Sequence, residues 1–129
     1  MKRKIKKNTK SLKALKDLAW AKISVYVRSL GANGEWNQCY TCLGWFKWKT
    51  QMDCSHYIHN RLDYELNNLK ACCKRCNKWL HGNLAIYGER LIKEIGLKEV
   101  RKMRLYSFKK GNNYSRQELE EIIKKYSLT

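Results

Sequence analysis

The apolar positions near the start of the chain predict one amphipathic helix. Between residues 11 and 30 they recur at spacings of three and four, which places them on one face of a helix. Thr9 or Ser11 can cap the first turn, and Gly31 can end the helix. Residues 1–10 are basic and poor in apolar side chains, and we expect them to form a flexible arm that contacts phosphates.

The C-terminal part has the same periodicity and predicts further helices. Apolar residues follow a helical stripe at 84–95 and again at 97–106, with Gly96 between the two stretches. Further on, Ser115 and Glu118 have the spacing of a capping box and mark the start of a last helix. The face of this helix that we expect to be buried carries Leu119, Ile122, Ile123 and Tyr126.

The middle of the chain lacks a helical period and predicts short strands between turns. Residues 43–58 are rich in aromatic side chains and are typical of a short ribbon. A returning strand is expected at 68–72, followed by a short helix at 74–81 that ends at Gly82. At 129 residues the chain is expected to form one domain over residues 11–129.

The charge of the chain is strongly positive. Its 28 Lys and Arg residues against 11 Asp and Glu residues give a net charge of +17, which is typical of a protein that binds nucleic acid. An RNA binder or a protein at an anionic membrane surface would share this excess. Candidate phosphate contacts are Lys10, Lys13, Lys16, His59 and Arg61, although each could simply face solvent. No apolar run is long enough to cross a membrane and no signal peptide is recognisable, so a soluble intracellular protein is expected.

Four cysteines predict a structural zinc site. Cys39 and Cys42 form one Cys-x-x-Cys pair, and Cys73 and Cys76 form another. Two such pairs can hold one Zn²⁺ between them in a tetrahedral arrangement. The predicted ion would close residues 39–83 into a core with fixed ends.

The other two cysteines have no predicted ligand partner. Cys54 and Cys72 are expected to be buried apolar fillers, although Cys72 could replace Cys73 as a zinc ligand. A disulfide scaffold is disfavoured, because secreted frameworks usually lack paired Cys-x-x-Cys motifs that enclose His and Asn. Residues 84–129 would then form a helical part beside the zinc-clamped core.

Three neighbouring residues in the predicted ribbon indicate hydrolytic chemistry. Residues two apart in a strand face the same way, so Asp53 and Ser55 share a face and His56 lies on the other side at the strand end. A carboxylate suits Mg²⁺, or Mn²⁺ in its place, and a neutral His near such an ion can take a proton from water. Asp53 is therefore predicted to hold a catalytic ion, and His56 is predicted to be the general base.

Two asparagines complete this pattern. Asn68 lies twelve residues after His56 and can bridge the loop to fix the backbone that aims the base, with Asn67 as the alternative. Asn77 follows nine residues later and can face the same ion. His81 is four residues beyond Asn77 and would share its helix face, which makes it a further candidate ligand.

These motifs resemble the HNH, or ββα-metal, endonucleases in the variant with two Cys-x-x-Cys pairs. More narrowly, the sequence is similar to the lambdoid phage NinG/Rap recombination endonucleases. The matching segments are LAWAKISVYVR, CYTCLGW, DCSHY, NNLKACCKRCNKWLHGN, IGLKEV and YSRQELEEI. The resemblance implies an α+β fold with a ββα-metal core and a structural zinc knuckle, flanked by an N-terminal helix and two or three C-terminal helices.

The resemblance also implies roles for individual residues. The general base, the structural asparagine and the last metal-binding position correspond to His56, Asn68 and Asn77. His81 corresponds to a position that is a ligand in only some HNH enzymes. Many HNH enzymes carry the acidic or His ligand immediately before the base, where this chain has Ser55 and the family pattern has Gly. Asp53 is therefore assigned as the ligand from strand geometry.

The expected function is that of a phage DNA endonuclease in the cytoplasm of a bacterial host. The resemblance implies branched recombination intermediates as substrates, such as Holliday junctions and D-loops, and products with 5′-phosphate ends. Zn²⁺ would be structural and Mg²⁺ catalytic. Because a junction has two strands to cut, a homodimer through the C-terminal helices is a further hypothesis. The alternatives are a non-catalytic zinc module that binds DNA and an HNH nickase that acts on ordinary duplex DNA.

Overall fold

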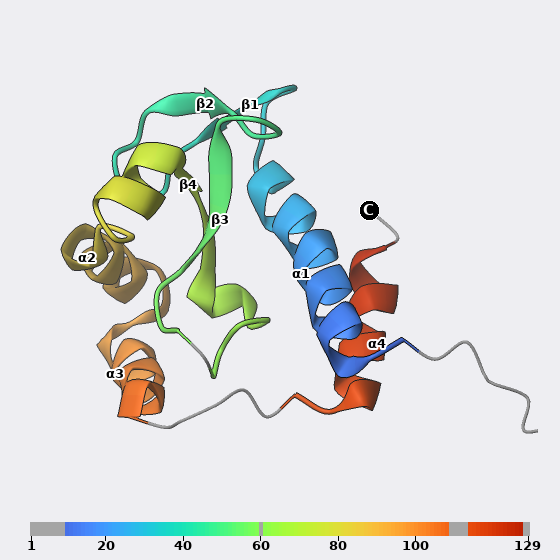
Figure 1. The fold of residues 1–129 in the computed structure, drawn as a ribbon. Coiled ribbons are helices and arrows are strands. Elements are labelled where there is room, and N and C mark those ends of the chain that lie inside the picture. The colour runs from blue at the N-terminus through green and yellow to red at the C-terminus, as the bar shows by residue number, and fades with distance from the viewer. Residues whose placement is uncertain (1–9, 60, 109–113, 128–129) are drawn as a thin grey trace, which may run out of the picture.

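The computed structural model describes residues 10–59, 61–108 and 114–127, which form helices around two short hairpins (Figure 1). In chain order the elements are α1 (Leu12–Ser29), β1 (Trp36–Gln38), β2 (Trp45–Lys47), β3 (Met52–His56), η1 (Leu66–Asn68), β4 (Leu69–Cys73), η2 (Arg75–Trp79), α2 (Leu84–Ile95), α3 (Leu97–Leu105), η3 (Tyr106–Phe108) and α4 (Arg116–Tyr126). The predicted arm lies outside the described residues except for Lys10. No helix in the described part is long and apolar enough to cross a membrane.

The first and last helices pack side by side and share one core. Ser11 caps α1 by accepting a hydrogen bond from the backbone N–H of Ala14 over 3.1 Å. Ser115 and Glu118 form the predicted capping box at the start of α4. The buried faces of both helices meet each other and one side of the hairpin β3–β4 (Figure 1). The core between them contains Leu15, Ala19, Ile23, Val27, Cys54, Tyr64, Leu69, Leu119 and Tyr126.

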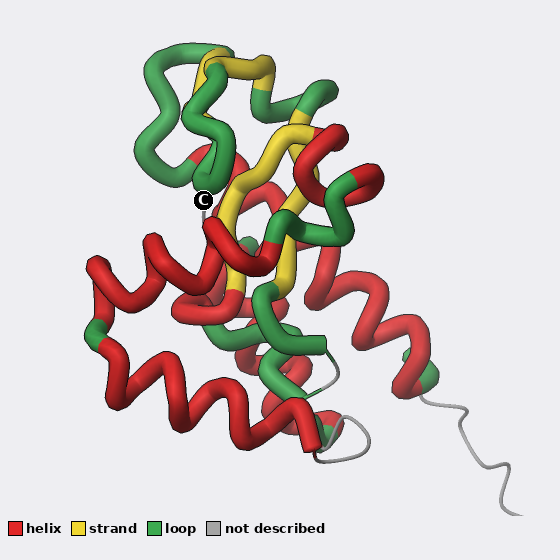
Figure 2. Tube along the Cα trace, turned by 90° about the vertical axis from the view of Figure 1, so that its left-hand side faces the viewer, coloured by secondary structure: helices red, strands yellow, loops and turns green. Residues whose placement is uncertain are grey.

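The hairpin β3–β4 separates this core from a second one. Its strands are antiparallel, with Met52 opposite Cys73 and His56 opposite Leu69. The second core joins the hairpin to α2, α3 and the cysteine region, and it contains Cys39, Met52, Tyr57, Ile58, Ala71, Cys72, Cys73, Cys76, Tyr87, Leu91, Val100 and Met103. Figure 2 shows the short strands enclosed by helices in this way. Side chains from β3 therefore reach both cores.

The hairpin β1–β2 is attached to the end of α1 by polar contacts. The strands are antiparallel, with Trp36 opposite Lys47. Arg28 Nη1 donates a hydrogen bond to the carbonyl of Trp48 over 2.9 Å. The buried side chain of Asn37 donates through Nδ2 to the carbonyl of Arg28 over 2.7 Å. The Asn37 bond satisfies a carbonyl at the C-terminal end of α1, and the Arg28 bond ties the chain that follows β2 to the same helix end.

Helix α2 sits close to the end of β3. The buried Tyr87 donates its hydroxyl to the carbonyl of Ser55 over 2.8 Å. A Cβ atom at Gly88 would lie 2.8 Å from Tyr57 Oη, so only glycine permits this close approach. Arg104 Nε of α3 donates to the same Tyr57 Oη over 2.9 Å. Helices α2 and α3 thus hold the strand end that carries His56.

The predicted helices are confirmed, the one at 74–81 in a shorter form, and one prediction for the middle of the chain is wrong. The single ribbon expected at 43–58 is two strands, β2 and β3, in two different hairpins. The helix expected at 74–81 is the single turn η2. This turn ends early because His81 and Gly82 adopt left-handed backbone conformations, with φ of 50° and 87°.

Candidate functional site

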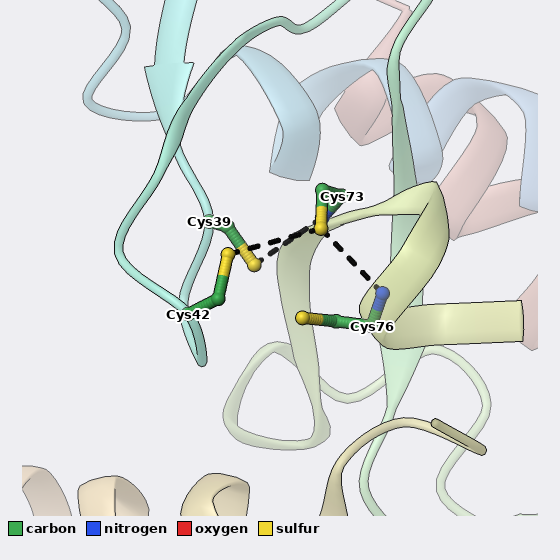
Figure 3. Close-up of side chains that lie close together, drawn as sticks. All are labelled: Cys39, Cys42, Cys73 and Cys76. Atoms are coloured by element: carbon green, nitrogen blue, oxygen red, sulfur yellow. Dashed lines mark hydrogen bonds between the residues drawn. The ribbon is translucent and has the colours of Figure 1, made fainter. Parts of the chain in front are cut away.

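Four cysteines from two separate segments meet beside the central hairpin (Figure 3). Cys39 and Cys42 come from the β1–β2 connection, Cys73 ends β4, and Cys76 lies in η2. Their sulfur atoms all lie within 4.8 Å of one another, and Cys42 Sγ is 3.8 Å from Cys73 Sγ. A tetrahedral zinc ion with Zn–S bonds of about 2.3 Å holds its sulfur ligands about 3.8 Å apart. The four cysteines could therefore hold one zinc ion.

The surroundings of the cysteines favour metal-bound thiolates. The backbone N–H of Cys73 donates to Cys39 Sγ over 3.3 Å, and that of Cys76 donates to Cys73 Sγ over 3.5 Å. A hydrogen bond with Cys72 is the main cause that lowers the pKa of Cys39 to about 3. Burial raises the pKa of Cys42. A divalent ion would remove this difference, because it deprotonates the thiols that coordinate it.

The two remaining cysteines are buried outside this cluster. The structure places Cys73, and not Cys72, among the four sulfur atoms that come together. Cys54 lies in the core beside α1, where burial raises the pKa of its thiol to about 12. Both residues are buried as the sequence predicted, but only Cys54 is a simple apolar filler, because Cys72 also forms a hydrogen bond with Cys39.

His56 ends β3, and its ring lies between two neighbours. The indole of Trp20 in α1 stacks on the imidazole, with ring centroids 4.6 Å apart and planes inclined by 14°. Asp63 Oδ1 lies 3.6 Å from His56 Nε2. This nitrogen is buried and has no hydrogen-bond partner within the described residues. The His56 side chain as a whole is 18% exposed, so the ring has a fixed direction and limited access to solvent.

The burial of His56 sets its protonation state. Desolvation lowers its pKa below the ordinary value of 6.5 and outweighs the opposite effect of Asp63. The imidazole is therefore neutral at pH 7, and this is the state in which a histidine can accept a proton.

Asn68 closes the loop that follows His56. Its side chain is fully buried and accepts a hydrogen bond at Oδ1 from the backbone N–H of Ile58 over 2.7 Å. Through Nδ2 it donates to the carbonyl of Ile58 over 2.7 Å and to that of Leu62 over 3.0 Å. The neighbouring Asn67 is exposed. Of the two asparagines, Asn68 therefore has the contacts expected of a residue that holds the backbone near His56.

Asp53 and Asn77 lie against each other. Asn77 Nδ2 donates to Asp53 Oδ2 over 3.1 Å, and Lys74 Nζ donates to Asp53 Oδ1 over 2.9 Å. Burial alone would raise the pKa of Asp53, but the hydrogen bonds from Lys74 and Asn77 outweigh it and lower the pKa below 3.8. The carboxylate is therefore ionised at neutral pH, and its negative charge attracts the ammonium group of Lys74.

The structure does not gather all the predicted ligands of the catalytic ion into one cluster. Groups of at least three His, Cys, Asp or Glu side chains whose possible ligand atoms lie close together are candidate metal sites. In the described part of the chain, the four cysteines form the only such group. Asp53 and His56 lie three positions apart in β3 and so point to opposite faces of the strand. His81 is exposed and lies beyond the end of η2, so it does not share a helix face with Asn77. The ligand roles of Asp53, Asn77 and His81 stay predictions.

The side chains predicted to contact DNA are wholly or partly exposed: Lys10, Lys13, Lys16, His59 and Arg61. The ring of His59 lies 5.7 Å from that of His56. Lys13 forms an exposed ion pair with Asp17 over 3.0 Å, so part of its charge is already balanced. These positions permit phosphate contacts and do not test them.

A family model described as the bacteriophage lambda NinG protein matches residues 1–129. The chain belongs to the NinG family. Neither the curated proteins nor the solved structures gave a match. The phage NinG part of the resemblance is thus confirmed, and its HNH part stays a prediction.

In this NinG-family protein, three side chains beside the predicted site were missed by sequence reasoning: Trp20, Asp63 and Lys74. Trp20 belongs to the amphipathic helix, and nothing in the sequence connects it to His56. Asp63 lies in a turn whose path no periodicity predicts. Lys74 directly follows Cys73, so the sequence did indicate that this lysine lies close to the four cysteines.

Proposed function

We propose that this protein is a metal-dependent endonuclease that hydrolyses phosphodiester bonds in branched DNA recombination intermediates. The observation that carries the proposal is the state of His56, a neutral, half-enclosed imidazole at the end of β3. The backbone just beyond it is fixed by the three hydrogen bonds of Asn68. A rigid and neutral imidazole is the arrangement that general-base catalysis needs. Membership of the NinG family and the resemblance to HNH enzymes support the same reading.

In the proposed reaction, His56 takes a proton from a water molecule. The water oxygen forms a bond to phosphorus while the bond from phosphorus to the 3′ oxygen breaks. The 3′ oxygen keeps the electron pair and takes a proton from solvent, so the products are a 3′-hydroxyl and a 5′-phosphate. Trp20 keeps the imidazole plane fixed, and Asn68 fixes the backbone after β3. Since the pKa of His56 is below 6.5, the base is available at neutral pH without prior deprotonation.

Asp53 and Asn77 are the residues proposed to hold the catalytic Mg²⁺. A carboxylate and an amide side chain in contact fit this ion, because Mg²⁺ uses few protein oxygen ligands and retains several waters. The ammonium of Lys74 on the same carboxylate marks the place as favourable for a cation. Mg²⁺ would stabilise the negative charge that develops on the phosphate oxygens. Asn77 would present its amide oxygen to the ion, which requires its amide to turn over relative to the hydrogen bond seen here.

The positive charge of the chain supports DNA as the substrate. A net charge of +17 favours a polyanion, and contacts of lysine and arginine to phosphates do not depend on base sequence. Such binding fits an enzyme that recognises the shape of a branch. The zinc ion proposed for the four cysteines would keep η2, and hence Asn77, in place beside β3.

The test compares cleavage of an end-labelled four-way junction with cleavage of a matched duplex in Mg²⁺ and in Mn²⁺. His56→Ala should bind the junction normally but cut it at least about 100-fold more slowly, since a general base contributes about that factor. Asn67→Ala, at an exposed residue to which the proposal gives no role, is the control and should retain cleavage within a few-fold. If the wild type cuts neither substrate with either metal, the proposal is wrong and a zinc-stabilised DNA-binding module takes its place. Equal cutting of both substrates would leave a nuclease without branch specificity.

A further inference from the structure

The side chain of Trp79 is largely exposed to solvent, although it lies close in sequence to the proposed metal ligand Asn77. Trp79 ends η2, the single turn that follows β4 and is drawn in yellow in Figure 1, and its surface is 80% exposed. Within the described residues its ring makes no hydrogen bond and no contact with another ring or a cation. A large aromatic side chain normally contributes to stability by burial, so an exposed one does not serve the fold.

The charges around Trp79 indicate what its ring would contact. The same segment carries Lys74, Arg75 and Lys78, all of them exposed. Lys74 Nζ lies 2.9 Å from Asp53 Oδ1, so its charge lies close to the proposed metal ligands. An indole on a segment that also carries three exposed cations suits a flat and anionic ligand, because the ring can stack on a planar group while the cations bind phosphates.

The position of η2 connects this surface to the proposed site. Asn77 faces Asp53 from the middle of the turn, and Trp79 lies two residues further on with its side chain in solvent. The indole and Asn77 belong to one short turn but, being two residues apart, do not share a face of it. DNA that reaches Asp53 and Asn77 would contact the indole by following the surface of this turn. In an intact duplex the bases are stacked on each other, and their faces are not accessible. At a branch point or in a single strand, a base face can be free.

We propose that Trp79 is a base-stacking residue that selects DNA with unpaired or unstacked bases near the scissile phosphate. The proposal deepens the proposed function and rests on DNA being the substrate. Lys74, Arg75 and Lys78 would hold the phosphates on either side of the stacked base. The ring of Trp79 would then distinguish branched from fully paired DNA, which backbone contacts alone do not do.

The test measures DNA binding without cleavage, with Ca²⁺ in place of Mg²⁺ and no chelator, so that zinc stays bound. Dissociation constants are determined for a four-way junction, for a fork with single-stranded arms and for a duplex. Trp79→Ala should weaken binding to the fork and the junction about tenfold or more, the range of stacking on one aromatic side chain, with duplex binding unchanged within twofold. Trp79→Phe should retain most of the preference.

Trp45→Ala is the matched control, because Trp45 is also exposed but lies on β2, away from η2. It should leave all three constants unchanged. Zinc content and melting temperature of each variant check the fold. The proposal is overturned if Trp79→Ala weakens all DNAs equally, if it weakens none, or if it changes only the oligomeric state in sedimentation experiments, which would make Trp79 a contact between protein chains.

The binding assay separates this inference from the proposed function. If the wild type never cuts DNA but Trp79→Ala still loses the preference for forks, base stacking stands and the nuclease proposal fails. If the wild type cuts junctions and Trp79→Ala binds and cuts them like the wild type, the nuclease proposal stands and base stacking fails.

Discussion

The indole of Trp20 lies on the imidazole of His56, with 4.6 Å between the ring centroids and 14° between the planes. The two residues are far apart in the sequence and come from different elements, α1 and β3. The contact removes one face of the imidazole from water, and desolvation is the main cause of the lowered pKa of His56. Helix α1 thus takes part in setting the chemistry of the proposed base.

Trp20→Ala should therefore change His56 as well as the packing of α1. With the indole gone, water reaches the imidazole, and we expect the pKa of His56 to rise toward 6.5 in an NMR titration. Cleavage should slow by about 10- to 100-fold, since a base displaced by about 1 Å loses about that factor. Trp20→Phe should keep both the pKa and most of the rate. An unchanged pKa in Trp20→Ala would show that the stacked ring does not control His56.

Replacing Asn68 should destabilise the protein much more than replacing its neighbour. Asn68→Ala leaves the backbone groups of Ile58 and the carbonyl of Leu62 without their buried partners, at about 1–3 kcal/mol for each unsatisfied group. A loss of about 3 kcal/mol or more is expected in urea unfolding. Asn67→Ala, at an exposed position, should stay within about 0.5 kcal/mol. Equal effects of the two substitutions would contradict the assignment of Asn68.

The pH dependence of cleavage should report the lowered pKa of His56. The base works while neutral, so the rate should stay high below pH 6.5 and fall only as pH drops through the lowered pKa. The free energy of unfolding should also decrease as pH falls below 6.5. In that range His56 binds a proton more readily in the unfolded chain than in the folded protein, because folding lowers its pKa. Because His59 also lowers the pKa of His56, His59→Gln should move the acid limb to slightly higher pH without removing it. An acid limb centred above pH 6.5 would argue against His56 as the titrating base.

Zinc should bind in a ratio of one ion per chain and should stabilise the fold. Structural zinc sites contribute about 10–16 kcal/mol of apparent binding free energy at pH 7, so a strong chelator should lower the melting temperature sharply. Cys42→Ala should lose the ion, as measured by atomic absorption. Cys54→Ala, which removes a cysteine outside the cluster, should keep one zinc per chain. Zinc loss in both variants would mean that the ion is bound differently.

Lys74 should compete with a divalent cation for Asp53. Its ammonium lies 2.9 Å from Asp53 Oδ1 and is about half exposed, so it can move away when an ion binds. Lys74→Ala should therefore bind Mn²⁺ more tightly, by a few-fold in an electron paramagnetic resonance titration. Asp53→Asn should weaken Mn²⁺ binding at least tenfold. If neither substitution alters Mn²⁺ affinity, Asp53 is not a ligand of the ion.

Local signals explain why much of the fold could be predicted. The apolar period gave the four helices, and the capping pair Ser115 and Glu118 gave the start of α4 correctly. The Cys-x-x-Cys spacings gave the four sulfur atoms that meet. The short helix expected at 74–81 is present but ends earlier than predicted, because the backbone is already left-handed at His81. His81 is not a glycine, so nothing in the sequence indicated this turn.

The sequence by itself determined which four cysteines meet and where the helices lie, because each depends on spacings within a short segment or a hairpin. Only the tertiary structure decided the surroundings of His56, where Trp20 arrives from α1 and Asp63 from a turn. It also decided that Lys74 and Asn77 share Asp53. These contacts depend on the angle at which helices pack on β3–β4, which is set by many buried side chains together and by no single motif.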